Sequence, residues 1–130
     1  MIFLDSDICI HFLNGKDLSI LKKFQEHKPG DLKIASIVQA ELLFGVQNSK
    51  KKLDNSEKLG RFLEPYEIVS FDDRAAAVYA QIRFELAKKG ALIGPNDLIL
   101  AATVIANDGS LATRNVGEFK RLARLKLEAW

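Results

Sequence analysis

The sequence predicts a single α/β domain, covering residues 1–130, in which helices flank a central, mostly parallel sheet. Two observations support this prediction. Short apolar runs that suit buried strands alternate with longer segments whose apolar residues recur at helical spacing. The chain also has 130 residues, of which 48% are hydrophobic, so it is long enough to bury one substantial core.

The first elements are a short strand and two helices. Residues 1–4 form an apolar run that ends at an acid and suits a buried strand. Residues 8–13 are mostly apolar and suit a helix that stops at Asn14-Gly15. Asp17 can cap a second helix, which Pro29-Gly30 ends and whose apolar residues fall at helical spacing: Leu18, Leu21 and Phe24.

The next elements are a strand and two helices of different character. Residues 32–36 suit a second strand, and Ser36 with Gln39 three positions later forms the pattern of a capping box. The helix that follows, residues 37–46, is apolar almost all round, which predicts that it is buried. Residues 50–63 are polar and suit an exposed helix.

The C-terminal half continues the alternation. A third strand is expected at residues 66–70, and Asp72 caps a long helix that ends at Gly90. Another apolar helix begins at Pro95 and ends before the turn Asn107-Asp108-Gly109. The remaining elements are short: a strand at residues 110–113, a helical turn at residues 116–121 and a strand at residues 125–130.

Composition restricts the class of protein. The net charge of +2 does not by itself indicate a nucleic-acid partner, and the basic groups at residues 50–52 and 120–126 are most simply solvated faces. Cys9 is the single cysteine, lies in an apolar run, and suits a small buried side chain in a reducing compartment. No apolar run reaches the roughly 20 residues of a membrane span, and no secretory signal is recognisable. We therefore expect a cytoplasmic protein.

Four polar residues fall where ligands bind in open α/β sheets, beyond the carboxyl ends of the strands. Asp5 ends the first strand, Asn115 follows the fourth, and Asp97 lies at the start of a helix. Glu41 lies farther along its helix, but helical side chains lean toward the N-terminus, so its carboxylate can reach the same edge.

Each acid alone has a simpler explanation: a turn bond or helix cap for Asp5, an N-cap for Asp97, and a tertiary salt bridge for Glu41. Together they are harder to explain, because two like charges about 4 Å apart repel by roughly 4 kcal/mol at an effective dielectric near 20. Either their pKa values rise or a cation lies among them. Oxygen ligands favour Mg²⁺ or Mn²⁺, and such a site suits phosphodiester hydrolysis.

Five motifs, in order across nearly the whole chain, resemble those of the PIN-domain ribonucleases, and most closely the VapC toxins of VapBC toxin–antitoxin systems: LDSDICI, AELLFG, IGPNDLILAA, ATRNVGEF and LKLEAW. The resemblance implies a PIN-like α/β/α domain with an acidic cluster that binds Mg²⁺ or Mn²⁺. Carried over by position, Asp5, Glu41 and Asp97 match the metal-binding acids. Asn115 stands where many PIN domains have a fourth acid and is expected to assist catalysis.

The resemblance also implies supporting residues, and the chain departs from the pattern at two positions. Ser6 matches a hydroxyl that usually follows the first acid, and Glu118 is expected beside the metal-bound water. Asp7 stands where such toxins often have Asn, and its charge suits tighter metal binding or a supporting role. Arg114 replaces a residue that is frequently uncharged; a contact with an RNA phosphate is one explanation, and a surface arginine is the simpler one.

The family implies a metal-dependent endoribonuclease toxin that cuts RNA, with transfer RNA as the guessed substrate and 5′-phosphate and 3′-hydroxyl products. It also implies a VapB antitoxin whose C-terminal segment approaches the acidic pocket, and a toxin homodimer. Two alternatives remain open. Asp5-x-Asp7 also fits a haloacid-dehalogenase-like phosphatase, which leaves Glu41 without a role. A non-catalytic RNA-binding PIN module is the second alternative.

Overall fold

Five strands form one sheet in the order β3-β2-β1-β4-β5, and every neighbouring pair is parallel. The computed structural model describes residues 1–130. The predicted α/β class is confirmed, and the sheet is parallel throughout. The strands occupy the expected segments: β1 (Ile2–Leu4), β2 (Leu32–Ala35), β3 (Glu67–Val69), β4 (Ser110–Thr113) and β5 (Lys126–Ala129).

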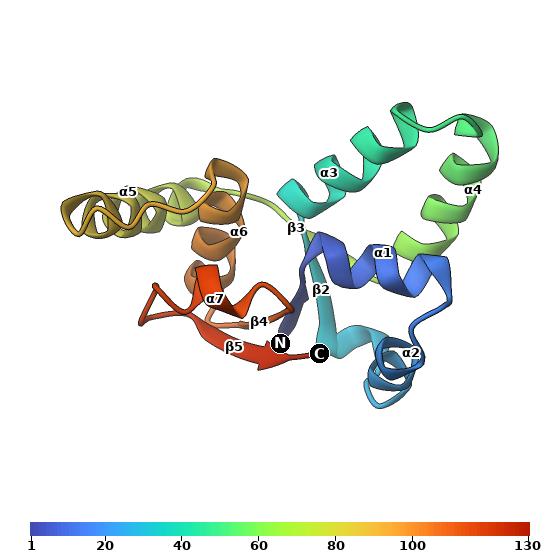
Figure 1. Cartoon of the computed structure of the whole chain (residues 1–130), viewed down its shortest axis with the longest axis horizontal. Helices are drawn as coiled ribbons and strands as arrows, with labels where there is room; N and C mark the ends of the chain where they lie inside the picture. Colours follow the sequence, from blue (N-terminus) through green and yellow to red (C-terminus); the bar gives the residue numbers. More distant parts are fainter.

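The connecting helices lie on both sides of this sheet (Figure 1). Their bounds are α1 (Ser6–Asn14), α2 (Leu18–Gln25), α3 (Ser36–Gln47), α4 (Lys52–Leu63), α5 (Asp73–Lys88), α6 (Pro95–Ala106) and α7 (Val116–Phe119), with a 3₁₀ turn at Pro29–Asp31. The chain steps outward from β1 through β2 to β3, returns to β4 beside β1, and steps outward again to β5. Because parallel crossovers are right-handed, α1 to α4 lie on one face, and α5 to α7 on the other.

The strand order therefore reverses between β1 and β4, which is the position where open α/β sheets bind their ligands. Both strands are apolar on their two faces because helices cover both. Phe3 and Leu4 of β1 and Leu111 and Ala112 of β4 are completely buried. Cys9 is completely buried as well, as predicted. No helix is long and apolar enough to span a bilayer.

The predicted helix boundaries at Gly15, Asp17 and Asp72 are confirmed. Gly15 ends α1 with a left-handed backbone at φ 67°, a conformation that glycine adopts without strain. Asp17 Oδ1 accepts hydrogen bonds from the Ser19 and Ile20 amides at 3.1 and 3.2 Å. Asp72 Oδ1 accepts one from the Ala75 amide at 2.9 Å. Both carboxylates thus pair amides that would otherwise lack a partner at a helix start.

Two predictions about α3 are wrong. Ser36 does not cap the helix; Ala35 precedes its first turn, and the Ser36 hydroxyl instead accepts a hydrogen bond from the Phe71 amide at 3.2 Å. The helix is not buried all round either, because only one face packs on the sheet. Leu43 and Phe44 are 49% and 69% exposed.

The helix predicted from Leu18, Leu21 and Phe24 is confirmed as α2, but these apolar residues do not all face the core. Leu18 is 77% exposed, and Leu21 is only half-buried. The buried side chains of α2 are Ile20 and Phe24, of which Phe24 packs against Phe12 with 4.2 Å between ring centroids. Helical spacing therefore identifies α2 but does not by itself identify the face of the helix that is buried.

Candidate functional site

Asp5 joins the two strands at the point where the strand order reverses. It follows β1 directly, is only 6% exposed, and its Oδ1 accepts a hydrogen bond from the Ser6 amide at 2.7 Å. Its Oδ2 accepts one from the hydroxyl of Thr113, the last residue of β4, also at 2.7 Å. Asp5 therefore caps α1, which was the simpler explanation for this acid. Only Oδ1 forms the cap, however, while Oδ2 contacts Thr113.

A second set of hydrogen bonds connects β4 to the start of α6. Thr113 Oγ1 accepts from the Asn115 amide at 3.0 Å, and Asn115 Nδ2 donates to Glu118 Oε2 at 2.8 Å. Glu118 Oε1 in turn accepts from the Gly94 amide at 2.9 Å. A Cβ atom on Gly94 would lie 3.8 Å from both Glu118 Oε1 and Asp97 Oδ2, so Asn115, Glu118 and Asp97 share one small region.

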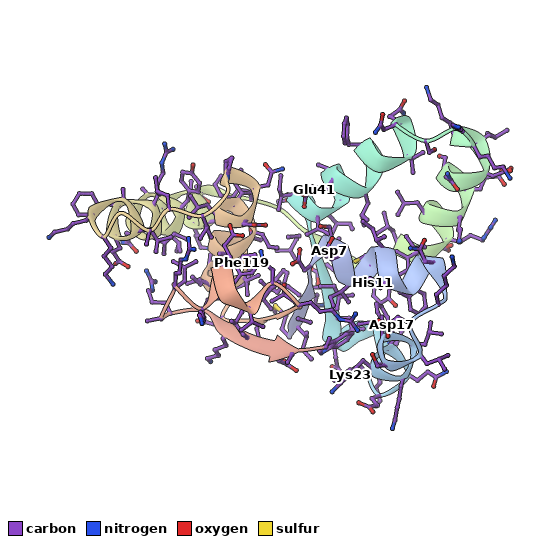
Figure 2. All side chains as sticks on the ribbon, viewed as in Figure 1. Asp7, His11, Asp17, Lys23, Glu41 and Phe119 are labelled. Atoms are coloured by element: carbon purple, nitrogen blue, oxygen red, sulfur yellow. The ribbon has the colours of Figure 1, made fainter.

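Besides burial, the charge of Asp5 raises the pKa values of both Glu41 and Asp97, so the two carboxyls lie near Asp5. Burial raises the pKa of Glu41, the nearby charges of Asp5 and Asp7 raise it further, and the Asn96 side chain opposes the rise. Burial also raises the pKa of Asp97, to about 7, with additional contributions from the charges of Glu118, Asp5 and Glu41. Figure 2 shows Asp7 and Glu41 near the centre of the molecule, where α1 approaches α3.

Asp5 and Glu118 have opposite shifts. Burial raises the pKa of Asp5, although the hydrogen bond from Thr113 partly offsets the rise. The hydrogen bonds from the Gly94 amide and the Asn115 side chain lower the pKa of Glu118. Between the neighbouring carboxyls of Asp97 and Glu118, the proton therefore belongs to Asp97, and Glu118 is the ionised partner.

None of these acids is paired with a cation. The ion pairs of the chain are Lys23–Glu26, Lys33–Glu67, Arg74–Asp72 and Arg114–Asp17, so the salt bridge considered for Glu41 is absent. Asp97 is not an N-cap, because Gly94 precedes the first turn of α6. In this conformation no three acidic side chains stand close enough to hold one ion. The donors nevertheless fit a hard divalent cation, since they are carboxylate oxygens without a neutralising partner.

The remaining predicted residues lie around this cluster. Ser6 begins α1, and its side chain lines a hollow together with Glu41 and Asn96. Asp7 is exposed in the first turn of α1 rather than facing Asp5 across a loop, which does not suit the paired carboxylates of the phosphatase alternative. Thr113 was not predicted. It follows Ala112, which pairs with Leu4, so the strand order was needed to see that it stands beside Asp5.

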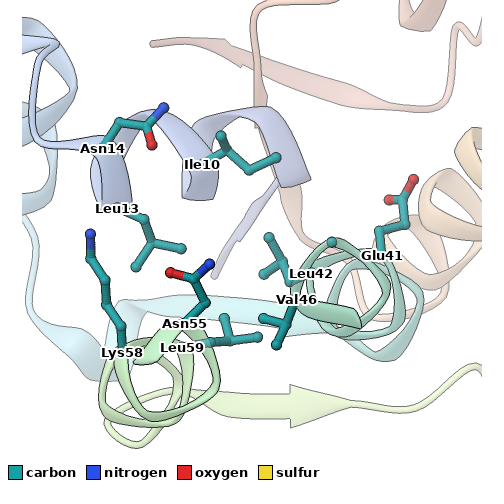
Figure 3. A pocket seen from close by; sticks show the side chains of 10 residues that line it. Ile10, Leu13, Asn14, Glu41, Leu42, Val46, Asn55, Lys58 and Leu59 are labelled. Atoms are coloured by element: carbon teal, nitrogen blue, oxygen red, sulfur yellow. The ribbon is translucent and has the colours of Figure 1, made fainter. Parts of the chain in front are cut away.

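An apolar groove of about 270 Å³ leads to this cluster along α1, α3 and α4 (Figure 3). Ile10 and Leu13 line one wall, and Leu42 and Val46 line another. Glu41 lies at one end of the groove, so an elongated segment placed in it would approach the acids (Figure 3).

Comparison with known proteins gives consistent matches over almost the whole chain. The model of the PIN domain family matches residues 2–125. The chain is 41% identical to Ribonuclease VapC2 of Rickettsia felis, over 98% of this chain and 96% of that protein. It is 31% identical to the tRNA(fMet)-specific endonuclease VapC of Shigella flexneri, with the same coverage. The crystal structure of VapBC2 from Rickettsia felis bound to promoter DNA contains a similar chain, with a TM-score of 0.93, 41% identity, and coverage of 100% of this chain and 99% of that one.

Proposed function

This chain belongs to the PIN-domain family, and from that membership we propose that it is a VapC-type endoribonuclease toxin restrained by a VapB-type antitoxin. The relatives described above, which it matches over 98% of its length, are named as a ribonuclease and an endonuclease, and a chain of similar fold occurs in a VapBC complex. The observation that supports hydrolysis most strongly is the cluster of Asp5, Glu41 and Asp97. Three carboxylates with raised pKa values and no cationic partner are suited to a divalent metal ion.

We propose that Asp5, Glu41 and Asp97 bind Mg²⁺ or Mn²⁺. When bound, such an ion supplies Lewis-acid activation of water and of the scissile phosphodiester. Thr113 orients Asp5, and each carboxylate oxygen of Asp5 retains a lone pair for a further contact. Asp97 must lose its proton before it can act as a ligand, so metal binding releases a proton near neutral pH.

The other residues hold these acids in place. Asn115 donates to Glu118, which holds the start of α6 through the Gly94 amide and thereby fixes Asp97. Ser6 stands where it can orient a ligand or the substrate. The exposed carboxylate of Asp7 adds negative charge at the site entrance and strengthens cation binding.

Cleavage of total transfer RNA in Mg²⁺ tests the catalytic proposal. Asp5→Asn preserves the cap on α1 but removes the charge of a proposed metal ligand. Loss of a residue that only supports a ligand lowers activity by about 10–100-fold, so Asp5→Asn should lower it at least as much. Asp73→Asn, an exposed acid in the first turn of α5, is the matched control and should remain active. Undiminished cleavage by Asp5→Asn would refute the proposed site. Hydrolysis of small phosphoesters but not RNA would favour the phosphatase alternative, and metal-independent RNA binding without cleavage would favour the binding module.

We propose that the antitoxin segment lies in the groove between α1, α3 and α4 and presents a basic side chain toward Glu41. Five apolar side chains line the groove, Glu41 lies at one end, and Asn14, Asn55 and Lys58 lie toward the other (Figure 3). This arrangement suits a segment with apolar side chains and a basic side chain at the end near Glu41. Ile10→Lys should weaken binding of the cognate antitoxin because Ile10 is 44% exposed and lines the groove. Leu53→Lys, on an exposed part of α4 outside it, is the control. Equal affinity of Ile10→Lys and the wild type would exclude this placement.

Transfer RNA is the substrate that we propose, by analogy with the Shigella flexneri relative, and the cytoplasm is the corresponding location. We also propose that two copies associate. The exposed face of α5 supports this, because Phe84 is 68% exposed there and has alanines around it. Light scattering should give the mass of a dimer for the wild type and of a monomer for Phe84→Lys; a monomeric wild type would refute the dimer.

A further inference from the structure

Arg114 lies between the two site residues Thr113 and Asn115, but its side chain contacts a different part of the molecule. Its Nη1 lies 2.7 Å from Asp17 Oδ2 in an ion pair. Its Nη2 donates to Ser19 Oγ at 3.2 Å, and its Nε donates to the main-chain oxygen of Trp130 at 3.0 Å. The guanidinium is therefore occupied by three internal partners, which does not suit the RNA-phosphate contact considered from the sequence.

These partners are themselves held firmly. Asp17 caps α2 through its other oxygen, Oδ1, which also accepts from the Ser19 hydroxyl at 2.7 Å. Trp130 is buried, with its ring 5.5 Å from that of Phe24 and stacked at 5.4 Å on His27. Arg114 thus connects the end of β4 to the start of α2 and to the segment after β5.

This connection bears directly on the acidic cluster. The Thr113 hydroxyl donates to Asp5 and the Asn115 side chain donates to Glu118, so both side chains face the cluster, whereas the Arg114 side chain contacts α2. Fixing the middle residue of the three restricts the backbone of both neighbours. Thr113 then holds Asp5 and the Asn115 amide, and Asn115 holds Glu118. Small errors in such outer contacts are costly, because a metal site depends on the orientation of its ligands.

We propose that Arg114 is a positioning residue that fixes the Thr113–Asn115 segment from outside the active site, through Asp17, Ser19 and Trp130. The proposal rests on the proposed function, since it assigns Arg114 to the support of that same site. An arginine is required because one planar guanidinium directs donors to three partners at once, which a lysine ammonium on a flexible stem does not.

The test uses Arg114→Ala, Arg114→Lys and Asp17→Asn in the full-length chain. Asp17→Asn keeps an oxygen for the cap on α2 but removes the charge that holds Arg114. Arg74→Ala is the matched control, because Arg74 also pairs with a capping aspartate, Asp72, but its other contact is Asn107, at the end of α6 opposite to Asp97. Mn²⁺ affinity is measured by calorimetry without RNA, and kcat and KM are measured with transfer RNA.

We expect Arg114→Ala to weaken Mn²⁺ binding and to lower kcat by about tenfold each, with KM changed by less than about twofold. Asp17→Asn should shift both quantities in the same direction, and its combination with Arg114→Ala should be no worse than Arg114→Ala alone, as for residues in one network. Arg114→Lys should restore only part of the loss. Arg74→Ala should match the wild type.

Wild-type Mn²⁺ affinity and kcat in both Arg114→Ala and Asp17→Asn would overturn the proposal. So would a rise in KM alone, which would mean that Arg114 contacts the RNA. If Arg114→Ala does not fold, Asp17→Asn decides. If the wild type neither binds Mn²⁺ nor cuts RNA, the proposed function fails, and hydrogen exchange of the Asn115 amide still tests the positioning role: about tenfold faster exchange in Asp17→Asn supports it, and unchanged exchange overturns it.

Discussion

Replacing Asp97 by Asn should stabilise the metal-free protein at alkaline pH while abolishing metal binding. Asp97 retains its proton in the folded chain up to about pH 7, because burial and the charges of Glu118, Asp5 and Glu41 disfavour the carboxylate. In the unfolded chain the proton leaves near the usual value of 3.8. The stability contributed by this group is therefore fully present below about pH 3.8 and is lost as the pH rises through about 7.

The size of the effect follows from the shift. A rise in pKa from 3.8 to about 7 corresponds to about 4 kcal/mol at ~1.36 kcal/mol per unit. Asp97 is only half-buried, so solvent screening reduces this figure, and we expect about 1–2 kcal/mol. An Asn at this position has nearly the same shape and an amide that can donate to Glu118, so it removes the charge with little change in packing.

The assay is urea unfolding in a chelator at pH 5 and pH 8. Asp97→Asn should gain about 1–2 kcal/mol over the wild type at pH 8 and less at pH 5, because the wild type still holds its proton there. The control Asp73→Asn should differ from the wild type by the same amount at both pH values. Adding Mn²⁺ at 100 times its Kd should then stabilise the wild type by about 2.7 kcal/mol and leave Asp97→Asn unchanged. An Asp97→Asn protein that is no more stable than the wild type at pH 8 would refute the electrostatic reasoning.

Two further substitutions test the packing around β1 and β4. Gly109→Ala should lower the free energy of unfolding by about 1–3 kcal/mol, because the added Cβ would lie 2.8 Å from the buried ring of Phe3 in β1. The control Gly60→Ala, whose Cβ meets no atom within 4 Å, should stabilise the protein. Equal free energies of unfolding in urea for the two variants would contradict this packing. Thr113→Val should lower the free energy of unfolding by about 1–3 kcal/mol. It should also raise the pKa of Asp5, because the hydrogen bond from Thr113 lowers that pKa, and should thus shift the acid limb of the pH–rate profile to higher pH. Thr103→Val, which is equally buried but bonds only to its own helix, should leave that limb in place; a shift in both variants would exclude a specific role for Thr113.

The features that the sequence predicted correctly are those that depend on neighbouring residues. Strand and helix alternate as expected because each element shows its period within a few residues. Asp17 and Asp72 cap their helices because a cap needs only amides two or three positions away. The cap predicted at Ser36 was wrong, because its hydroxyl accepts a hydrogen bond from the amide of Phe71, which lies 35 residues along the chain.

The features that were missed depend on strand order. Nothing in the local sequence indicates that Thr113 stands beside Asp5, which lies 108 residues away. The pairing of Arg114 with Asp17 likewise needs β4 and α2 to be placed in space. The exposure of Phe44 on α3 was missed for another reason: a helix that is apolar almost all round does not show in its sequence which face packs on the sheet.

The position of the acids makes the site depend on the docking of both halves of the chain. Asp5 lies at the boundary between them, Glu41 comes from α3 on one face of the sheet, and Asp97 comes from α6 on the other. A displacement of α3 relative to α6 would therefore separate the proposed metal ligands Glu41 and Asp97. In the proposed placement, the antitoxin segment in the groove along α1, α3 and α4 would contact Glu41 directly and neutralise its charge. Under this proposal, restraint by the partner needs no distant conformational change, because Glu41 belongs to both the groove and the acidic cluster.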